Sequence, residues 1–111
     1  MVQYAQKLDS TFGALSDSTR RGILTRLGKG DASVSDLAGK FAMTLTGMRK
    51  HIQVLENAGL VTTEKVGRVR TARLTTRRMA DESRWIASYG KALNERLNQL
   101  DEFLERTRSK P

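Results

Sequence analysis

The order of patterns between residues 37 and 74 constrains the fold more than any other feature of this sequence. A short helix pattern reaches a turn at residues 42–43, and a second helix pattern follows it. Two β-rich runs, residues 61–66 and 69–74, come next and are joined by the two-residue hairpin signal Gly67-Arg68. This order predicts a mostly α-helical domain with one small β-hairpin.

The second of these helices is predicted to be amphipathic, with Thr44 as its N-cap and Ala58-Gly59 at its end. Its apolar face consists of Leu45, Met48, Ile52 and Leu55, and its polar face of Thr46, Arg49, Lys50, Gln53 and Asn57. The preceding helix, residues 34–41, is opened by a capping-box pattern at Ser33 and Asp36. Helices within 34–58 and a wing at 61–74 have the layout of a winged helix-turn-helix, whose second helix lies in a DNA groove.

Three further helices are expected, which makes five in all. An apolar stripe of residues 5, 8, 12 and 15 predicts the first, and Asp17 or Ser18 caps a second that Gly28 and Gly30 end. A long C-terminal helix begins at Thr75 or Thr76 and covers about 77–106.

The C-terminal helix carries a near-heptad apolar stripe. The helix could fold back on its own domain, but the stripe covers about five turns, which favours a dimer seam with the first helix as its partner. The predicted dimer interface consists of Leu8, Phe12, Ile86, Tyr89, Leu93, Leu97, Leu100 and Leu104.

Length and charge limit the classes of protein that fit. A chain of 111 residues predicts a single domain, 1–111. The net charge is +8, and residues 43–78 hold eight bases against two acids. A positive charge concentrated on the second helix and the wing favours a nucleic-acid partner.

Several functions are not expected. No cysteine is present, so no disulfide and no thiolate metal site can form. The sequence shows neither a signal peptide nor an apolar run of the ~20 residues that a membrane span requires, so a cytoplasmic protein without a membrane partner is predicted. His51, the lone histidine, forms no catalytic set; half-buried packing and a phosphate contact are both open for it.

The order of motifs resembles the arsenic-repressor (ArsR/SmtB) family of bacterial winged-helix regulators, from about Leu8 to Leu104. The matching stretches are LSDSTRRGIL at 15–24, MRKHIQVLENAGLV at 48–61 and WIASY at 85–89. The resemblance implies a homodimer that binds operator DNA near its own promoter and represses transcription until an inducer, often a metal ion, releases it.

Two departures separate this chain from the metal-sensing members. Where many members have C-V-C-D-L, residues 33–37 read SVSDL, and hydroxyls do not replace thiolates for soft metals. The last helix has no histidine for a second common site. No metal site and no cofactor are therefore predicted, and the inducer remains unknown.

The DNA-binding residues predicted from the pattern and the resemblance are Thr44, Leu45, Thr46, Arg49, Lys50, Gln53, Lys65, Arg68 and Arg70. Arg49 or Lys50 suits guanine, and Gln53 suits adenine. Leu45 either touches a thymine methyl or packs under the turn. Gly47 could allow a close approach to the DNA backbone, whereas Thr63 is expected to be structural only.

Three functions fit these features. The first is a homodimeric, sequence-specific repressor at a palindromic operator. The second is a sequence-tolerant architectural DNA-binding protein, which phosphate contacts alone would support. The third is a winged-helix module that binds an acidic partner protein.

Overall fold

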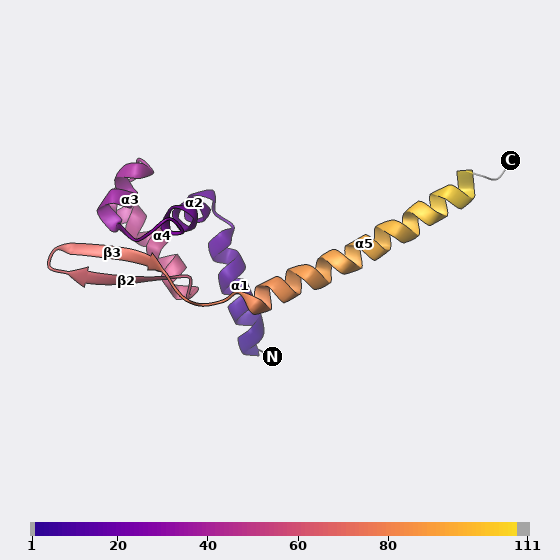
Figure 1. Cartoon of the computed structure of the whole chain (residues 1–111), viewed down its shortest axis with the longest axis horizontal. Helices are drawn as coiled ribbons and strands as arrows, with labels where there is room; N and C mark the ends of the chain where they lie inside the picture. Colours follow the sequence, from indigo (N-terminus) through magenta and orange to yellow (C-terminus); the bar gives the residue numbers. More distant parts are fainter. Residues whose placement is uncertain (1, 109–111) are drawn as a thin grey trace. The chain divides into compact units, whose positions relative to one another are not determined.

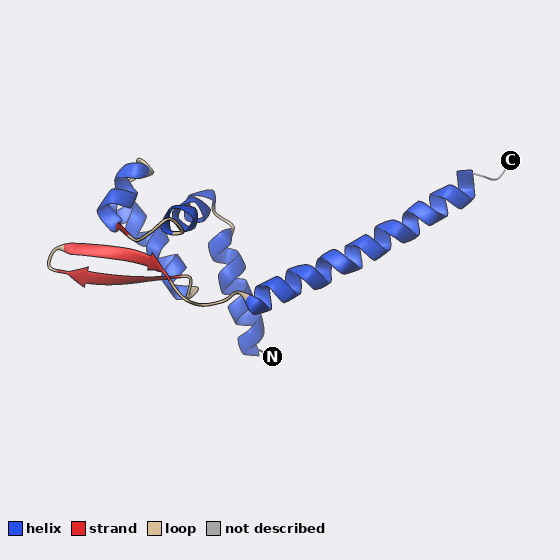
Figure 2. Ribbon diagram, viewed as in Figure 1, coloured by secondary structure: helices blue, strands red, loops and turns tan. Residues whose placement is uncertain are grey.

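The computed structural model describes residues 2–108 and divides the chain into two compact units, one ending at Arg78 and the other beginning at Met79. The helices are α1 (Val2–Leu15), α2 (Ser18–Leu27), α3 (Val34–Lys40), α4 (Leu45–Asn57) and α5 (Ala80–Arg108). The strands are β1 (Ala32–Ser33), β2 (Val61–Val66) and β3 (Val69–Leu74) (Figures 1 and 2). The described residues confirm the predicted five helices and winged helix-turn-helix order. Residues 1 and 109–111 of the predicted domain lie outside them.

Side-chain caps fix the starts of three helices, as the sequence predicts. Asp17 accepts a hydrogen bond from the Arg20 amide at 3.0 Å and caps α2. This bond is the main reason why the pKa of Asp17 lies below its ordinary value of 3.8. Ser33 caps α3 and Thr44 caps α4, each through its hydroxyl and an amide three residues later at 3.0 Å.

The turn between α3 and α4 contains a residue in the left-handed region. Ala42 has φ 53°, the one positive φ of a non-glycine residue within residues 2–108. Around it, the Met43 amide donates to the Ala38 carbonyl at 2.9 Å and closes the end of α3. The predicted helix 34–41 is therefore one residue too long, because Phe41 is the C-cap.

The wing is part of a three-stranded antiparallel sheet in the order β1-β3-β2. In the hairpin, Val66 pairs with Val69 across Gly67-Arg68, and Gly67 has φ 64°, a conformation that glycine adopts without strain. The sequence did not predict β1, whose two residues pair Ala32 with Ala72 and Ser33 with Thr71.

The core of the first unit lies among α2, α3, α4 and the sheet. Ile23, Leu37, Met48, Leu55 and Val61 are fully buried and come from α2, α3, α4 and β2. Helix α4 therefore has its apolar face fixed against α3 and β2, which leaves its opposite face exposed.

Helix α5 begins at Ala80, so the predicted start near residues 75–77 is wrong. The reason is local: the Thr75 amide donates to the Leu60 carbonyl at 3.1 Å, and its hydroxyl donates to the Gly59 carbonyl at 2.8 Å. These bonds keep the chain extended past the end of β3. The helix runs to Arg108, two residues beyond the predicted end.

The apolar side chains of the predicted seam on α5 are exposed in the single chain. All six seam residues of α5, together with Trp85 and Phe103, have exposed fractions between 43% and 57%. The rings of Trp85 and Tyr89 stack in parallel with their centroids 5.6 Å apart. On α1, by contrast, Leu8 is buried and Phe12 is half-buried within the chain.

Among the described residues, no helix combines the length and the apolar character that crossing a membrane requires.

Candidate nucleic-acid interface

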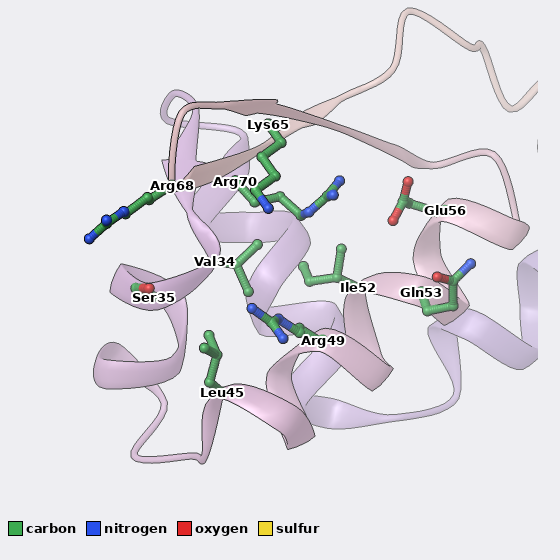
Figure 3. Close-up of a pocket in the computed structure, with 10 residues that line it drawn as sticks. All are labelled: Val34, Ser35, Leu45, Arg49, Ile52, Gln53, Glu56, Lys65, Arg68 and Arg70. Carbon is green, nitrogen blue, oxygen red and sulfur yellow. The ribbon is translucent and has the colours of Figure 1, made fainter.

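A groove of about 540 Å³ runs between α4, the start of α3 and the wing (Figure 3). It is lined by Val34, Ser35, Leu45, Arg49, Ile52, Gln53, Glu56, Lys65, Arg68 and Arg70. Six of the nine predicted DNA-binding residues therefore line one surface. Four of the lining residues are cations and one is an acid, so the groove is suited to an anionic ligand.

The exposed face of α4 carries the predicted base-reading residues. Thr46, Arg49, Lys50 and Gln53 are all exposed. The Gln53 amide donates to the Asn57 side chain at 2.9 Å, which orients the carboxamide along the helix. Leu45 has an exposed fraction of 38% and faces the groove, so a thymine-methyl contact remains a prediction for it.

Thr44 and Gly47 form the N-terminal cap of α4. The Thr44 hydroxyl accepts from the Gly47 amide at 3.0 Å. A Cβ on Gly47 would lie 3.1 Å from this same oxygen and 3.3 Å from the Met43 methyl. Glycine at this position therefore leaves room for the cap, an explanation that the sequence alone did not offer.

The wing presents its cations on two different sides. Side chains alternate along a strand, so Lys65 and Arg70, which pair across β2 and β3, share the face of the sheet that carries buried Ala72. Both extend toward the space between the wing and α4 (Figure 3). Arg68 lies at the hairpin tip, where it lines the end of the groove and its exposed side chain extends outward (Figure 3).

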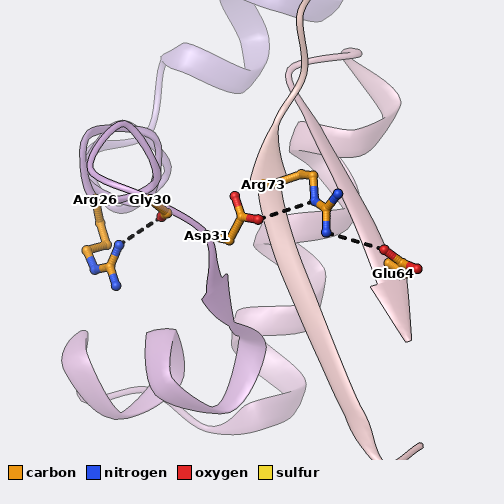
Figure 4. Close-up of polar contacts among 5 residues, drawn as sticks. All are labelled: Arg26, Gly30, Asp31, Glu64 and Arg73. Carbon is orange, nitrogen blue, oxygen red and sulfur yellow. Dashed lines mark hydrogen bonds and ion pairs between the residues drawn. The ribbon is translucent and has the colours of Figure 1, made fainter. Parts of the chain in front are cut away.

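Arg73 belongs to the other face of the wing. Its Nε lies 3.5 Å from Asp31, and its Nη2 lies 3.3 Å from Glu64 (Figure 4). All three side chains are largely exposed, so the pairs add little stability. They do, however, neutralise Arg73 on the side of the sheet away from the groove.

Thr63 is the residue of this interface that the sequence did not reveal. Its hydroxyl accepts from Arg70 Nη1 at 3.0 Å and donates to Glu56 Oε2 at 3.3 Å. It thereby connects the wing to the last turn of α4. A threonine in a β-rich run carries no local signal for such a contact.

His51 is half-buried and is the partner of Arg20 from α2, 3.2 Å away. The same guanidinium donates to the Ala14 carbonyl at 2.8 Å and to the Gly13 carbonyl at 3.2 Å. His51 is therefore half-buried against a specific partner, Arg20, as the packing alternative predicts. A phosphate contact of His51 remains a prediction.

The two serines in the place of metal-binding cysteines have other positions. Ser33 caps α3, and Ser35 is exposed at the edge of the groove. Within residues 2–108, no group of three or more histidine, cysteine, aspartate or glutamate side chains could hold a metal ion.

An exposed polar helix face beside a basic wing defines a winged helix-turn-helix DNA-binding protein. A family model described as a helix-turn-helix domain matches residues 15–64. A crystal structure of an ArsR family transcriptional regulator is 40% identical, with a TM-score of 0.75 over 85% of this chain and 97% of that one. The chain belongs to the ArsR family of DNA-binding transcriptional regulators, which are not enzymes. The predicted family and the absence of enzyme function are thereby confirmed.

Two other proteins extend this comparison. The transcriptional repressor SdpR of Bacillus subtilis (strain 168) is 28% identical over 82 residues, which are 74% of this chain and 91% of SdpR. A homodimeric winged helix-turn-helix DNA-binding domain from Mycobacterium bovis shares the fold, with 24% identity, a TM-score of 0.65 and 88% of each chain covered.

Proposed function

We propose that this regulator is a homodimeric, sequence-specific repressor that binds an imperfectly palindromic operator near its own promoter. The observation that carries the proposal is the exposed row of Thr46, Arg49, Lys50 and Gln53 on α4, beside the basic wing. Sequence-tolerant binding requires only cations, whereas this row also offers hydroxyl and amide groups that suit base edges. The likeness to the repressor SdpR supports repression.

In this proposal α4 lies in the major groove, where its exposed side chains read bases. Arg49 or Lys50 binds guanine, and Gln53 binds adenine. The Thr44 hydroxyl and the start of α4 meet a phosphate. Lys65 and Arg70 bind the backbone, and Arg68 at the hairpin tip reaches the minor groove or its flanking phosphates.

The exposed apolar stripe of α5 supports dimerisation. Ile86, Tyr89, Leu93, Leu97, Leu100 and Leu104 repeat at steps of three or four residues, which is the spacing of a helix-helix seam. Because Leu8 and Phe12 are already wholly or partly buried within the chain, α5 supplies most of the proposed interface. Two copies would place the recognition helices one helical turn apart on DNA, ~34–36 Å.

The proposal is tested by fluorescence anisotropy on the DNA upstream of the protein's own gene, against a shuffled duplex of equal composition. The titrations are run at two salt concentrations, with and without a chelator. A preference of roughly 10³-fold or more for the native duplex is expected, because specific binding exceeds non-specific binding by about this factor or more. The chelator should change nothing.

Equal and steeply salt-dependent binding to both duplexes would favour an architectural protein, since phosphate contacts alone produce that behaviour. The absence of binding to either duplex would instead favour a protein-interaction module. A preference that disappears with chelator would contradict the proposed independence from metal ions.

A further inference from the structure

We propose that Thr63 is a positioning residue for DNA binding. Its hydroxyl is bound to Glu56 and holds the Arg70 guanidinium over the groove between the wing and α4. The inference rests on the proposed function, because the phosphate contact of Arg70 is part of it. It concerns three residues from three elements, namely Glu56 from α4, Thr63 from β2 and Arg70 from β3.

The three side chains form a directional chain of hydrogen bonds. Arginine can only donate, and an ionised carboxylate can only accept. The Thr63 hydroxyl does both: it accepts from Arg70 Nη1 at 3.0 Å and donates to Glu56 Oε2 at 3.3 Å. Only a hydroxyl at position 63 can satisfy both neighbours in this geometry, so serine is an adequate replacement and valine is not.

The chain of bonds restricts a flexible side chain that is otherwise exposed. Arginine has about 2 kcal/mol of rotamer entropy to lose when it is ordered. In the structure, Arg70 is exposed but extends across the groove toward Glu56 (Figure 3). One of its five donors is occupied by Thr63, which leaves the others for a phosphate. The ordering of Arg70 therefore precedes DNA binding.

Glu56 explains why the hydrogen bonds matter for the wing as a whole. It is an acid that lines a groove with four cations, and it accepts a hydrogen bond from Thr63 while keeping its charge. This bond connects the last turn of α4 to β2. The recognition helix and the phosphate-binding side chain of the wing are thereby held in a fixed relation.

The neighbouring residue Thr62 provides a matched control. Side chains alternate along β2, so Thr62 lies on the face opposite to Thr63, and it is exposed. Thr62→Val makes the same chemical change in the same strand, but away from Arg70 and Glu56. Both changes replace one β-branched residue by another, which keeps the strand preference similar.

The test measures the Kd for operator DNA by anisotropy at fixed salt for Thr63→Val, Thr63→Ser and Thr62→Val. Thr63→Val should raise Kd about three- to tenfold, the range that the net loss of one ordinary hydrogen bond predicts. Thr63→Ser and Thr62→Val should both stay within about twofold of the wild type, because the hydroxyl at position 63 is retained. Urea unfolding of each variant reports separately on stability.

A double-mutant cycle with Arg70→Ala distinguishes positioning from a general structural effect. Thr63→Val should have almost no effect in the Arg70→Ala background, because no guanidinium remains to be held. Equal losses in both backgrounds, an unchanged Kd for Thr63→Val, or an equal loss for Thr62→Val would each overturn the inference. The two failures are distinguishable. The absence of a sequence preference in the wild-type protein would contradict the proposed function, whereas a wild-type preference with an unchanged Kd for Thr63→Val would contradict only the inference.

Discussion

Arg20 of α2 donates a hydrogen bond from Nη1 to Nδ1 of His51 on α4, with 3.2 Å between the two nitrogens. Because arginine can only donate, Nδ1 of His51 is the acceptor in this contact. The other donors of Arg20 bind the carbonyls of Gly13 and Ala14 at the end of α1. One guanidinium thus joins the end of α1 and the start of α2 to the middle of α4.

Arg20→Met should lower the free energy of unfolding by roughly 2 kcal/mol, since two partly buried hydrogen bonds and one exposed one, of about 0.5–1.5 kcal/mol each, are lost. Urea denaturation followed by circular dichroism measures the change. Arg21→Met is the control, because Arg21 is exposed and its guanidinium donates to the Leu15 carbonyl at 2.7 Å. A loss of equal size in both variants would contradict the joining function of Arg20.

Ala42→Gly should stabilise the protein by about 1 kcal/mol, because an L-residue with a side chain is strained in the left-handed region and glycine is not. The φ of 53° at Ala42 places it in this region. Ala58→Gly serves as the opposite control: Ala58 ends α4 with φ −80°, so glycine there gains nothing and adds chain entropy to the unfolded state. Thermal unfolding midpoints should move in opposite directions for the two variants.

Arg49→Ala should relax base preference at one step of the operator, at a cost of about 1–3 kcal/mol in discrimination, if Arg49 binds a base edge. Competition binding across a library of mutated operators measures the preference position by position. Arg26→Ala is the control, because Arg26 lies on α2 and donates to the Gly30 carbonyl at 2.9 Å (Figure 4). A library profile that Arg49→Ala leaves intact would exclude base reading by this residue.

Arg68→Ala should weaken binding to all sequences alike and reduce the slope of log K against log salt by about 0.9, the value for one phosphate contact. Arg73→Ala removes the same charge from the same hairpin. However, Arg73 is already paired with Asp31 and Glu64 on the other face, so the slope should change less. Equal slopes for the two variants would show that hairpin charge alone matters, and not the position of Arg68.

Leu97→Glu should break the dimer, because it places a charge in the middle of the apolar seam of α5. Light scattering should then give the 12.4 kDa of a single chain in place of twice that mass. Asn98→Glu adds the same charge at the next residue, which a helix turns away from the stripe, and should stay dimeric. A dimeric mass for Leu97→Glu would exclude α5 as the seam.

The features that local patterns determine could be predicted from the sequence. Asp17, Ser33 and Thr44 cap their helices as expected, because a cap depends on residues only three positions apart. Gly59, with φ 75°, ends α4 for a similarly local reason. The hairpin follows from two β-rich runs and the turn between them.

The features that depend on distant residues could not be predicted. Strand β1 exists only because Ala32 meets Ala72, forty positions further along the chain, and two residues are too few to form a pattern. The start of α5 depends on the contact of Thr75 with Gly59 and Leu60. In the candidate site, the cations could be identified, but not which of them are free: Arg73 is neutralised by acids that a sequence does not place beside it.

Ser33 is the last residue of β1 and at the same time the N-cap of α3, so the sheet ends and the helix begins on consecutive residues. No linking residue separates β1 from α3. Inserting or deleting one residue there would shift the pairing of Ala32 with Ala72, which turns a buried side chain outward, or leave the first turn of α3 without its acceptor. Changes in chain length during the evolution of this protein are therefore expected in residues 28–31 rather than at the junction.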